Sequence, residues 1–172
     1  MKKILLLLLF ISSASIIAVS QEWKLPEPNK NVLDPNFTKG TMQVAVEGLN
    51  FGWAYGRITS GIGIRYGYFV RDNGLLFLNG EFSSYGKGME QYQIGLAYRQ
   101  YFNTKNIVPY VQLGANMGRG FFTNRDTQDF YNITVGGGAT FQIGKFGFDL
   151  GLQLNVWDKV NIGPRVGVSY SF

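Results

Sequence analysis

Apolar and polar residues alternate with a period of two along most of the chain after Thr41. The clearest example is the segment 146–156, in which one face is entirely apolar and the other holds only polar residues and glycine. The apolar positions are Phe146, Phe148, Leu150, Leu152, Leu154 and Val156. Side chains alternate between two faces in a β-strand, whereas an amphipathic helix repeats about every 3.6 residues. The pattern therefore predicts an all-β fold, and an aromatic content of 16% agrees with it because aromatic residues favour strands.

The alternation predicts eight antiparallel strands. Their expected ranges are 41–55, 61–70, 75–84, 91–102, 107–117, 130–143, 146–156 and 163–172. In the first strand the apolar positions change from even to odd residue numbers, as a β-bulge near Glu47 and Gly48 would produce. In the third strand residues 75–78 are apolar on both faces, so the alternation leaves its register open.

The connections between the predicted strands differ in length in a regular way. Those after the second, fourth and sixth strands, residues 71–74, 103–106 and 144–145, have the length and composition of hairpin turns. The connection after the fifth strand, Gly118 to Asp129, is the longest. Short turns on one side and longer loops on the other are typical of outer-membrane barrels whose termini lie in the periplasm. We therefore expect the Gly118–Asp129 loop to lie at the cell surface.

The first forty residues lack this alternation. Residues 1–20 carry Lys2 and Lys3, then an apolar run, then small residues that end at Ser20, which is the order of a cleaved signal peptide. A retained membrane anchor is the alternative, but serines interrupt the run. Residues 21–40 contain three of the five prolines, and we predict an extended periplasmic lead-in, with a ligand-binding tail as the alternative. The barrel is expected to occupy residues 41–172.

Alternation with a period of two is also expected in a soluble β-sandwich, so a second argument is needed to show that the apolar face contacts lipid. In a membrane, strands can pair all their backbone polar groups only if they form a closed barrel. Strands of about 9 to 11 residues are long enough to cross the bilayer. Aromatic residues fall near both strand ends, as two interfacial girdles would require. The outer set is Trp53, Tyr55, Phe82, Tyr92 and Tyr131, and the inner set is Tyr68, Phe102, Phe141, Phe146, Tyr170 and Phe172. The predicted fold is an eight-stranded antiparallel up-and-down transmembrane β-barrel.

The last segment, Val166 to Phe172, resembles the terminal strand of outer-membrane barrels, in which alternating apolar residues end in a carboxy-terminal Phe. With the signal peptide, the eight strands and the loop lengths, residues 41–172 resemble the OmpA transmembrane domain and OmpX-like barrel families. The resemblance implies the outer membrane of a Gram-negative bacterium, with Tyr170 and Phe172 as the signal for the barrel-assembly machinery. It also implies outer-membrane lipid and lipopolysaccharide as partners and no binding of nucleic acid. It leaves open which surface or protein partner the barrel has.

Six charged residues fall on the face opposite the apolar one. They are Glu47, Arg65, Glu81, Arg99, Asp149 and Arg165. An eight-stranded barrel has room inside only for side chains, so these charges should pair in a structural network, with Arg65 and Glu81 as one candidate pair. Amides on the same face should assist, namely Gln43, Gln93, Gln112, Asn132, Gln153 and Asn155. A gated polar path or a small-ligand site is the alternative.

The chain contains neither histidine nor cysteine. Outer-membrane lipid A deacylases, palmitoyl transferases, phospholipases and omptin proteases share the barrel form but depend on histidine, whose pKa suits general base catalysis. We therefore predict no enzyme, no cofactor and no metal site. The predicted function is a structural or surface-interaction role with a filled polar lumen. The alternatives are a narrow, porin-like channel for small solutes and a soluble lipocalin-like binder.

Overall fold

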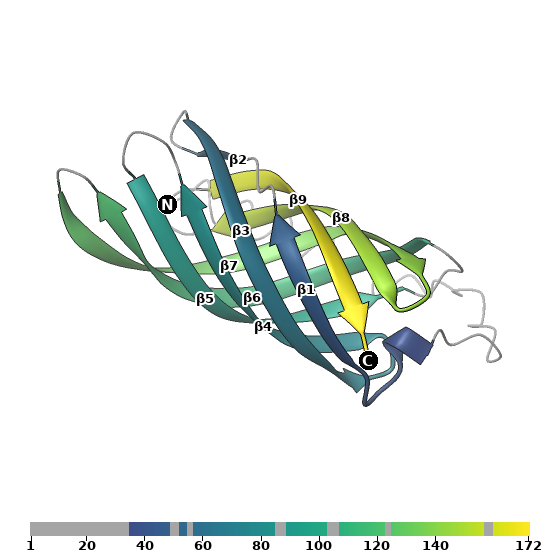
Figure 1. Cartoon of the computed structure of the whole chain (residues 1–172). Coiled ribbons are helices and arrows are strands. Elements are labelled where there is room, and N and C mark those ends of the chain that lie inside the picture. The colour runs from purple at the N-terminus through teal and green to yellow at the C-terminus, as the bar shows by residue number, and fades with distance from the viewer. Residues whose placement is uncertain are drawn as a thin grey trace, which may run out of the picture. The chain divides into compact units, whose positions relative to one another are not determined.

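The computed structural model forms one antiparallel sheet that closes on itself (Figure 1). It describes residues 35–48, 52–54, 57–84, 89–102, 107–122, 125–156 and 160–172. The predicted signal peptide and most of the predicted lead-in lie outside these ranges. The elements are η1 (Pro35–Phe37), β1 (Met42–Gly48), β2 (Gly52–Ala54), β3 (Arg57–Arg71), β4 (Gly74–Ser84), β5 (Met89–Tyr101), β6 (Ile107–Phe122), β7 (Arg125–Ile143), β8 (Phe146–Val156) and β9 (Val160–Ser171).

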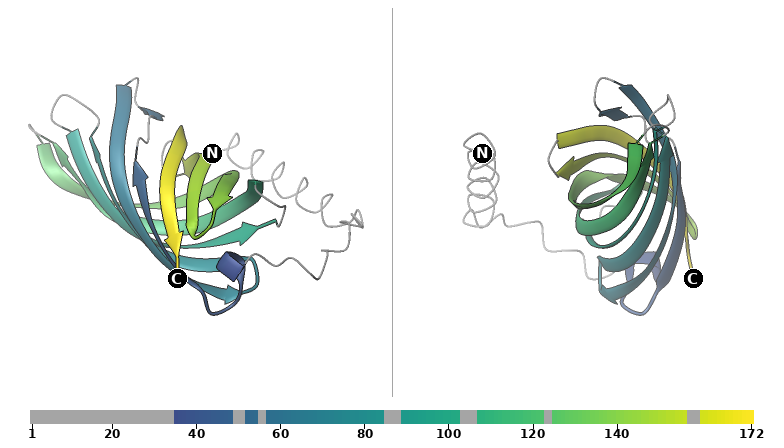
Figure 2. Two further views of the ribbon diagram at one scale, coloured as in Figure 1. Left: turned by 45° about the vertical axis from the view of Figure 1, so that its right-hand side comes forward. Right: turned by 90° about the vertical axis from the view of Figure 1, so that its left-hand side faces the viewer.

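Each strand from β3 onward pairs with the next, and β9 returns to pair with β1. Both β1 and β2 pair with β3 on one side and with β9 on the other, so they are two parts of one interrupted strand. The barrel therefore has eight strands, and Figure 2 shows them curving around a common axis. This confirms the predicted fold. Among the described residues, no helix has the length and apolar character needed to span a membrane.

The interruption in the first strand is a one-residue insertion. Gly48 lies opposite Ile62 of β3, whereas Gly52 lies opposite Thr59, so four steps on the first strand match three on its neighbour. The pairing with β9 shifts by one residue in the same way. The predicted bulge is therefore confirmed, and it lies between Gly48 and Gly52, a few residues beyond the expected position.

Alternating burial shows which face of each strand is apolar. In β1 the residues alternate between exposed and buried, and the exposed ones are Met42, Val44 and Val46. The same holds for β8, whose exposed face carries Phe146, Phe148, Leu150 and Leu152. The outside of the barrel is therefore apolar and the inside is mostly polar, which is the surface of a protein embedded in lipid.

The two-sided apolar run in the third predicted strand has a structural explanation. Leu76 and Leu78 point outward and are 40% and 55% exposed, whereas Leu75 and Phe77 point into the lumen and are buried. The lumen is thus apolar at one end. This is the end where β1 begins and β9 ends, and we call it the inner end. The turns at Asp72–Asn73 and Gly144–Lys145 lie there as predicted, while the predicted turn 103–106 falls outside the described residues.

The structure corrects the longest predicted loop. Residues 118–122 continue β6 and residues 125–129 begin β7, with Arg119 opposite Asp129 and Gly120 opposite Gln128. The prediction of a Gly118–Asp129 loop was therefore wrong. No apolar face alternates with a polar one there, so the segment carries no strand signal, although residues 118–120 pair with residues 128–130 and Phe122 pairs with Arg125. The two strands form a long hairpin, seen at the far left of Figure 1.

Candidate functional site

The lumen holds the candidate site, and the six charged residues expected there do lie together. They come from β1, β3, β4, β5, β8 and β9, and their side chains are all nearly fully buried. We call them the lumen charge network: Glu47, Arg65, Glu81, Arg99, Asp149 and Arg165. With three arginines and three acids, the network is electrically balanced. This balance matters because a buried charge without a partner costs several kcal/mol.

Glu47 lies at the centre of the network. Its carboxylate oxygens are 2.6 Å from Arg65 Nη1, 3.5 Å from Arg99 Nη2 and 3.0 Å from Arg165 Nε. One acid is therefore shared by three arginines that come from three different strands. The sequence indicated that Glu47 faces the lumen but not that it is the common partner, because strand registers alone do not tell which side chains meet across a barrel.

Asp149, on β8, contacts two of the same arginines. Its Oδ2 is 2.8 Å from Arg65 Nη2 and 2.9 Å from Arg99 Nη1, and its Oδ1 accepts a hydrogen bond from Thr140 Oγ1 at 2.5 Å. Glu81 completes the network through Arg165 Nη2 at 2.7 Å. The candidate pair Arg65–Glu81 is thus replaced by Arg65 with Glu47 and Asp149, while Glu81 pairs with Arg165.

Amide side chains fill the lumen on the outer side of the charges. Asn116 donates to Asn132 Oδ1 at 2.6 Å and to Thr134 Oγ1 at 2.7 Å, and Asn132 donates to Gln93 Oε1 at 2.9 Å. Gln153 accepts hydrogen bonds from Gln112 and from Arg165, which connects the amides to the charges. The sequence analysis did not single out Asn79 and Asn116. Their place in the alternation, on the same face as Glu81 and Gln112, is the signal that marks them.

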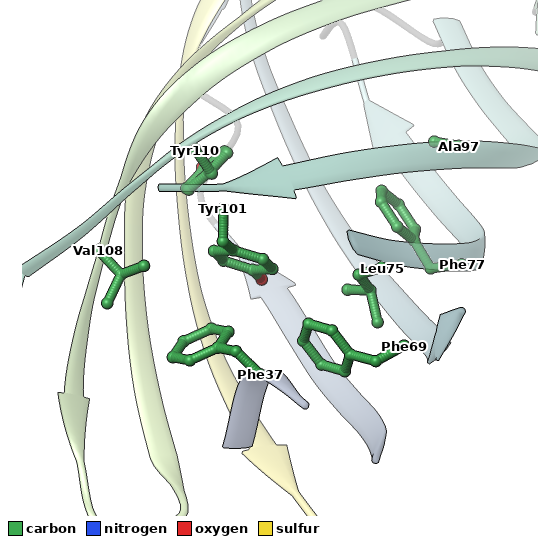
Figure 3. Close-up of a cluster of buried hydrophobic side chains, with 8 residues drawn as sticks. All are labelled: Phe37, Phe69, Leu75, Phe77, Ala97, Tyr101, Val108 and Tyr110. Carbon is green, nitrogen blue, oxygen red and sulfur yellow. The ribbon is translucent and has the colours of Figure 1, made fainter. Parts of the chain in front are cut away.

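An apolar cluster closes the inner end of the lumen (Figure 3). We call it the inner-end cluster: Phe37, Phe69, Leu75, Phe77, Ala97, Tyr101, Val108 and Tyr110. Tyr110 meets the charges directly, since the guanidinium carbon of Arg99 lies 3.9 Å from the centroid of its ring. The sequence analysis missed this cluster. The signal was the group of large apolar residues on the lumen-facing side of strand ends, where polar residues were expected.

Two glycines make the position of Tyr110 possible. Gly138 and Gly151 lie opposite each other on β7 and β8, and a Cβ on either would come within 2.8 Å of the Tyr110 hydroxyl. At Gly138 the same Cβ would also approach the carbonyl oxygen of Leu150 to 2.2 Å. The glycine-rich stretch of β7 therefore leaves space for an aromatic ring, which is a common role of glycine within a strand.

The outer surface carries aromatic residues near both ends of the barrel. Phe82, Tyr92 and Tyr131 are exposed towards the outer end, and the ring centroids of Tyr92 and Phe121 are 5.5 Å apart. At the inner end Phe146, Tyr170 and Phe172 form a continuous row of ring contacts. The side chains of Trp53 and Tyr55, also expected in the outer girdle, lie outside the described residues.

The lumen therefore balances its own charges. Its charged and amide groups bind one another, and within the described ranges no cluster of His, Cys, Asp or Glu is suited to a metal ion. The absence of an enzymatic activity and of a cofactor stays a prediction.

Solved structures with the same architecture exist. The N-terminal β-barrel domain of Pseudomonas aeruginosa OprF aligns with a TM-score of 0.64 and 19% identity, over 78% of this chain and 98% of that domain. Neisserial surface protein A, NspA, gives 0.63 and 17%, over 77% of this chain and 96% of that chain. The fold is that of the eight-stranded outer-membrane barrels.

A third outer-membrane barrel agrees with the first two. Ail, the attachment invasion locus protein of Yersinia pestis, aligns with a TM-score of 0.56 and 15% identity, over 78% of this chain and all of that one, 100%. At these identities the likeness concerns the fold. No protein-family model matches the sequence, and no curated protein matches it.

Proposed function

We propose that this chain is an integral outer-membrane protein with a structural or surface-interaction role, whose barrel does not conduct and holds the β6–β7 hairpin outside the membrane. The lumen charge network carries the proposal. Arg65 and Arg99 are fully buried, and together with Glu47 and Asp149 they occupy the middle of the lumen. A filled eight-stranded barrel is a stable anchor and leaves no pore for solutes.

The length of the outer strands supports the surface role. A strand needs about 9 to 11 residues to cross a bilayer, whereas β6 has 16 and β7 has 19. Residues of β7 before Ile133 extend beyond the last described pair with β8, which joins Ile133 to Val156. The hairpin therefore extends beyond the described wall on the β8 side, whereas β5 stays paired with β6 as far as Met89 and Phe122. Its outer end can contact other molecules. The same fold serves a Neisserial surface protein and the attachment invasion locus protein of Yersinia pestis.

Liposome swelling separates this proposal from the narrow-channel alternative. Folded protein is incorporated into vesicles in a quantified amount, and the vesicles are then placed in isotonic solutions of a pentose or of glycine. We expect no swelling above that of protein-free vesicles, and no stable conductance when the same preparation is fused with a planar bilayer. Steady swelling that scales with the amount of folded protein would overturn the proposal and favour the channel.

A further inference from the structure

A short segment before β1 crosses the inner end of the barrel. We call it the strap: residues 36–40, which begin in η1 and end at Gly40. The sequence analysis included these residues in an extended lead-in, whereas the structure makes them part of the barrel. Asn36 and Phe37 are both buried. The strap is thus a fixed element of the fold.

Besides the hydrogen bond from the Lys39 backbone N–H to Asp72 Oδ1 at 2.8 Å, three contacts attach the strap to the rest of the barrel. Asn36 Nδ2 donates to the carbonyl oxygen of Gly144 at 2.8 Å, in the turn between β7 and β8. The carbonyl oxygen of Phe37 accepts from the backbone N–H of Asn73 at 2.7 Å, in the turn between β3 and β4. Gly40 donates to the carbonyl oxygen of Phe69 in β3 at 3.0 Å. The two turns lie on opposite sides of the seam between β1 and β9.

The backbone is specialised at each of these points. Within the described ranges the positive φ angles are those of Asn73, Gly144 and Gly40, at 61°, 59° and 98°. Glycine adopts this conformation without cost, and asparagine tolerates it better than most residues. Each of the three residues supplies the donor or acceptor that holds the strap. The backbone conformations of the two turns therefore go together with the hydrogen bonds that Asn73 and Gly144 make to the strap.

Phe37 packs into the inner-end cluster from below (Figure 3). Its ring centroid lies 4.6 Å from that of Tyr101 and 5.8 Å from that of Phe69, and the side chain is fully buried. The contacts come from β3 and β5, whereas the Asn36 hydrogen bond reaches the turn before β8. The strap is therefore held on both sides of the line where the chain's first and last strands meet.

The β1–β9 seam is where the barrel closes, and it joins the two ends of the barrel sequence. It pairs Gln43–Gly48 with Val166–Ser171, and Met42 and Phe172 exchange hydrogen bonds of 3.0 and 2.9 Å. We infer that the strap is a clasp for this seam: with Phe37 seated and Asn36 bound to the β7–β8 turn, it opposes separation of β1 from β9. The barrel then opens slowly, because opening must first release the strap.

The test uses the unfolding rate of the purified barrel in detergent with guanidinium. Phe37→Ala removes the seated ring, and large-to-small changes of this kind cost enough to raise the unfolding rate by at least about tenfold. The matched control is Phe102→Ala, which removes a 43% exposed ring at the same end and should leave the rate nearly unchanged. Equal rates for the two variants would overturn the inference.

A disulfide across the β1–β9 seam distinguishes a strap that holds the seam closed from one that only adds packing to the barrel. Ala45 and Ser169 lie directly opposite each other, are both buried in the lumen, and form a non-hydrogen-bonded pair because the pairs alternate from Met42–Phe172. Ala45→Cys with Ser169→Cys should form a disulfide across the seam in a chain that has no other cysteine. In this background Phe37→Ala should accelerate unfolding no more than Phe102→Ala. The same tenfold acceleration with the seam locked would overturn the inference.

A milder variant keeps the test decisive if Phe37→Ala does not fold. Asn36→Ala removes the hydrogen bond to Gly144 and leaves the ring in place. Hydrogen exchange should then become faster at the amides of β1 and β9 while those paired between β5 and β6 stay protected. Uniform acceleration in all strands, or no change at the seam, would count against the clasp.

Discussion

Arg99 illustrates what a buried charge requires. Its side chain is fully buried, and its guanidinium contacts Asp149 at 2.9 Å, Gln112 at 2.7 and 3.0 Å, and the ring of Tyr110. These partners come from two other strands, β6 for Gln112 and Tyr110 and β8 for Asp149. Removing the arginine would leave the buried carboxylates of Asp149 and Glu47 with one arginine fewer.

We therefore expect Arg99→Ala to lower the free energy of unfolding by about 3 to 5 kcal/mol, the usual cost of breaking a buried ion pair. Arg119→Ala is the control, because the Arg119–Asp129 pair is exposed, with side chains 46% and 62% accessible. Such exposed pairs are screened by solvent and contribute little to stability. Equilibrium unfolding in urea with the barrel in lipid vesicles measures both. Similar small losses for the two variants would show that the lumen charges are not structural.

At the scale of elements, the β6–β7 hairpin differs most from its neighbours. Its outward face passes from apolar residues such as Met117 and Tyr131 to the exposed pair of Arg119 with Asp129, joined at 2.6 Å. A charged pair on the outward face marks the point where the strands leave the hydrocarbon region. Beyond it the hairpin continues as paired backbone, so it presents a defined surface rather than a loose loop.

The hairpin should be accessible from outside the cell. An epitope inserted between Thr123 and Asn124, at the connection of β6 and β7, should be labelled by antibody on intact cells, because the start of β1 and the end of β9 lie at the opposite end of the barrel. The same epitope inserted between Gly144 and Lys145, in the β7–β8 turn, should be labelled only after permeabilisation. The reverse result would mean that the barrel is inserted the other way round.

At the scale of the whole molecule, the distribution of apolar and polar side chains is the reverse of that in a soluble protein. Its outward face carries Ile64, Leu113, Ile133 and Leu152, each more than half exposed, while arginines and acids fill the interior. A soluble lipocalin-like binder would need the opposite arrangement. Apolar exposure that extends around every strand has no stable state in water, and lipid is the solvent that suits it.

This arrangement predicts a heat-dependent change in gel mobility. The protein should be found in the outer-membrane fraction, and in SDS it should migrate differently before and after boiling. The reason is that closed strand pairing leaves the detergent no free edge at which to begin unfolding. Recovery in the soluble periplasmic fraction, with the same mobility at both temperatures, would support the lipocalin-like alternative.

The sequence alone determined the parts of this protein that depend on alternation. Side chains on a strand point to opposite faces, so the period of two identified the eight strands, the lipid-facing residues and the six lumen charges. The change of parity in the first strand even revealed the bulge, because a one-residue insertion moves every following side chain to the other face. These are local properties of a strand and need no knowledge of its neighbours.

Only the tertiary structure decided which residues meet across the lumen. Glu47 contacts Arg65 and Arg165 from the two strands that flank it, β3 and β9. It also contacts Arg99 of β5 across the lumen, because the curvature of the barrel brings that strand close, and no spacing in the sequence encodes that distance. Phe37 lies in a segment without alternation, so no pattern in the sequence indicated that its side chain is buried. Its site is formed by residues of β3 and β5 that come together only in the folded barrel. The outer half of the β6–β7 hairpin was hidden for a related reason: outside the lipid both faces of a strand meet water, so selection for an apolar face disappears and the alternation with it.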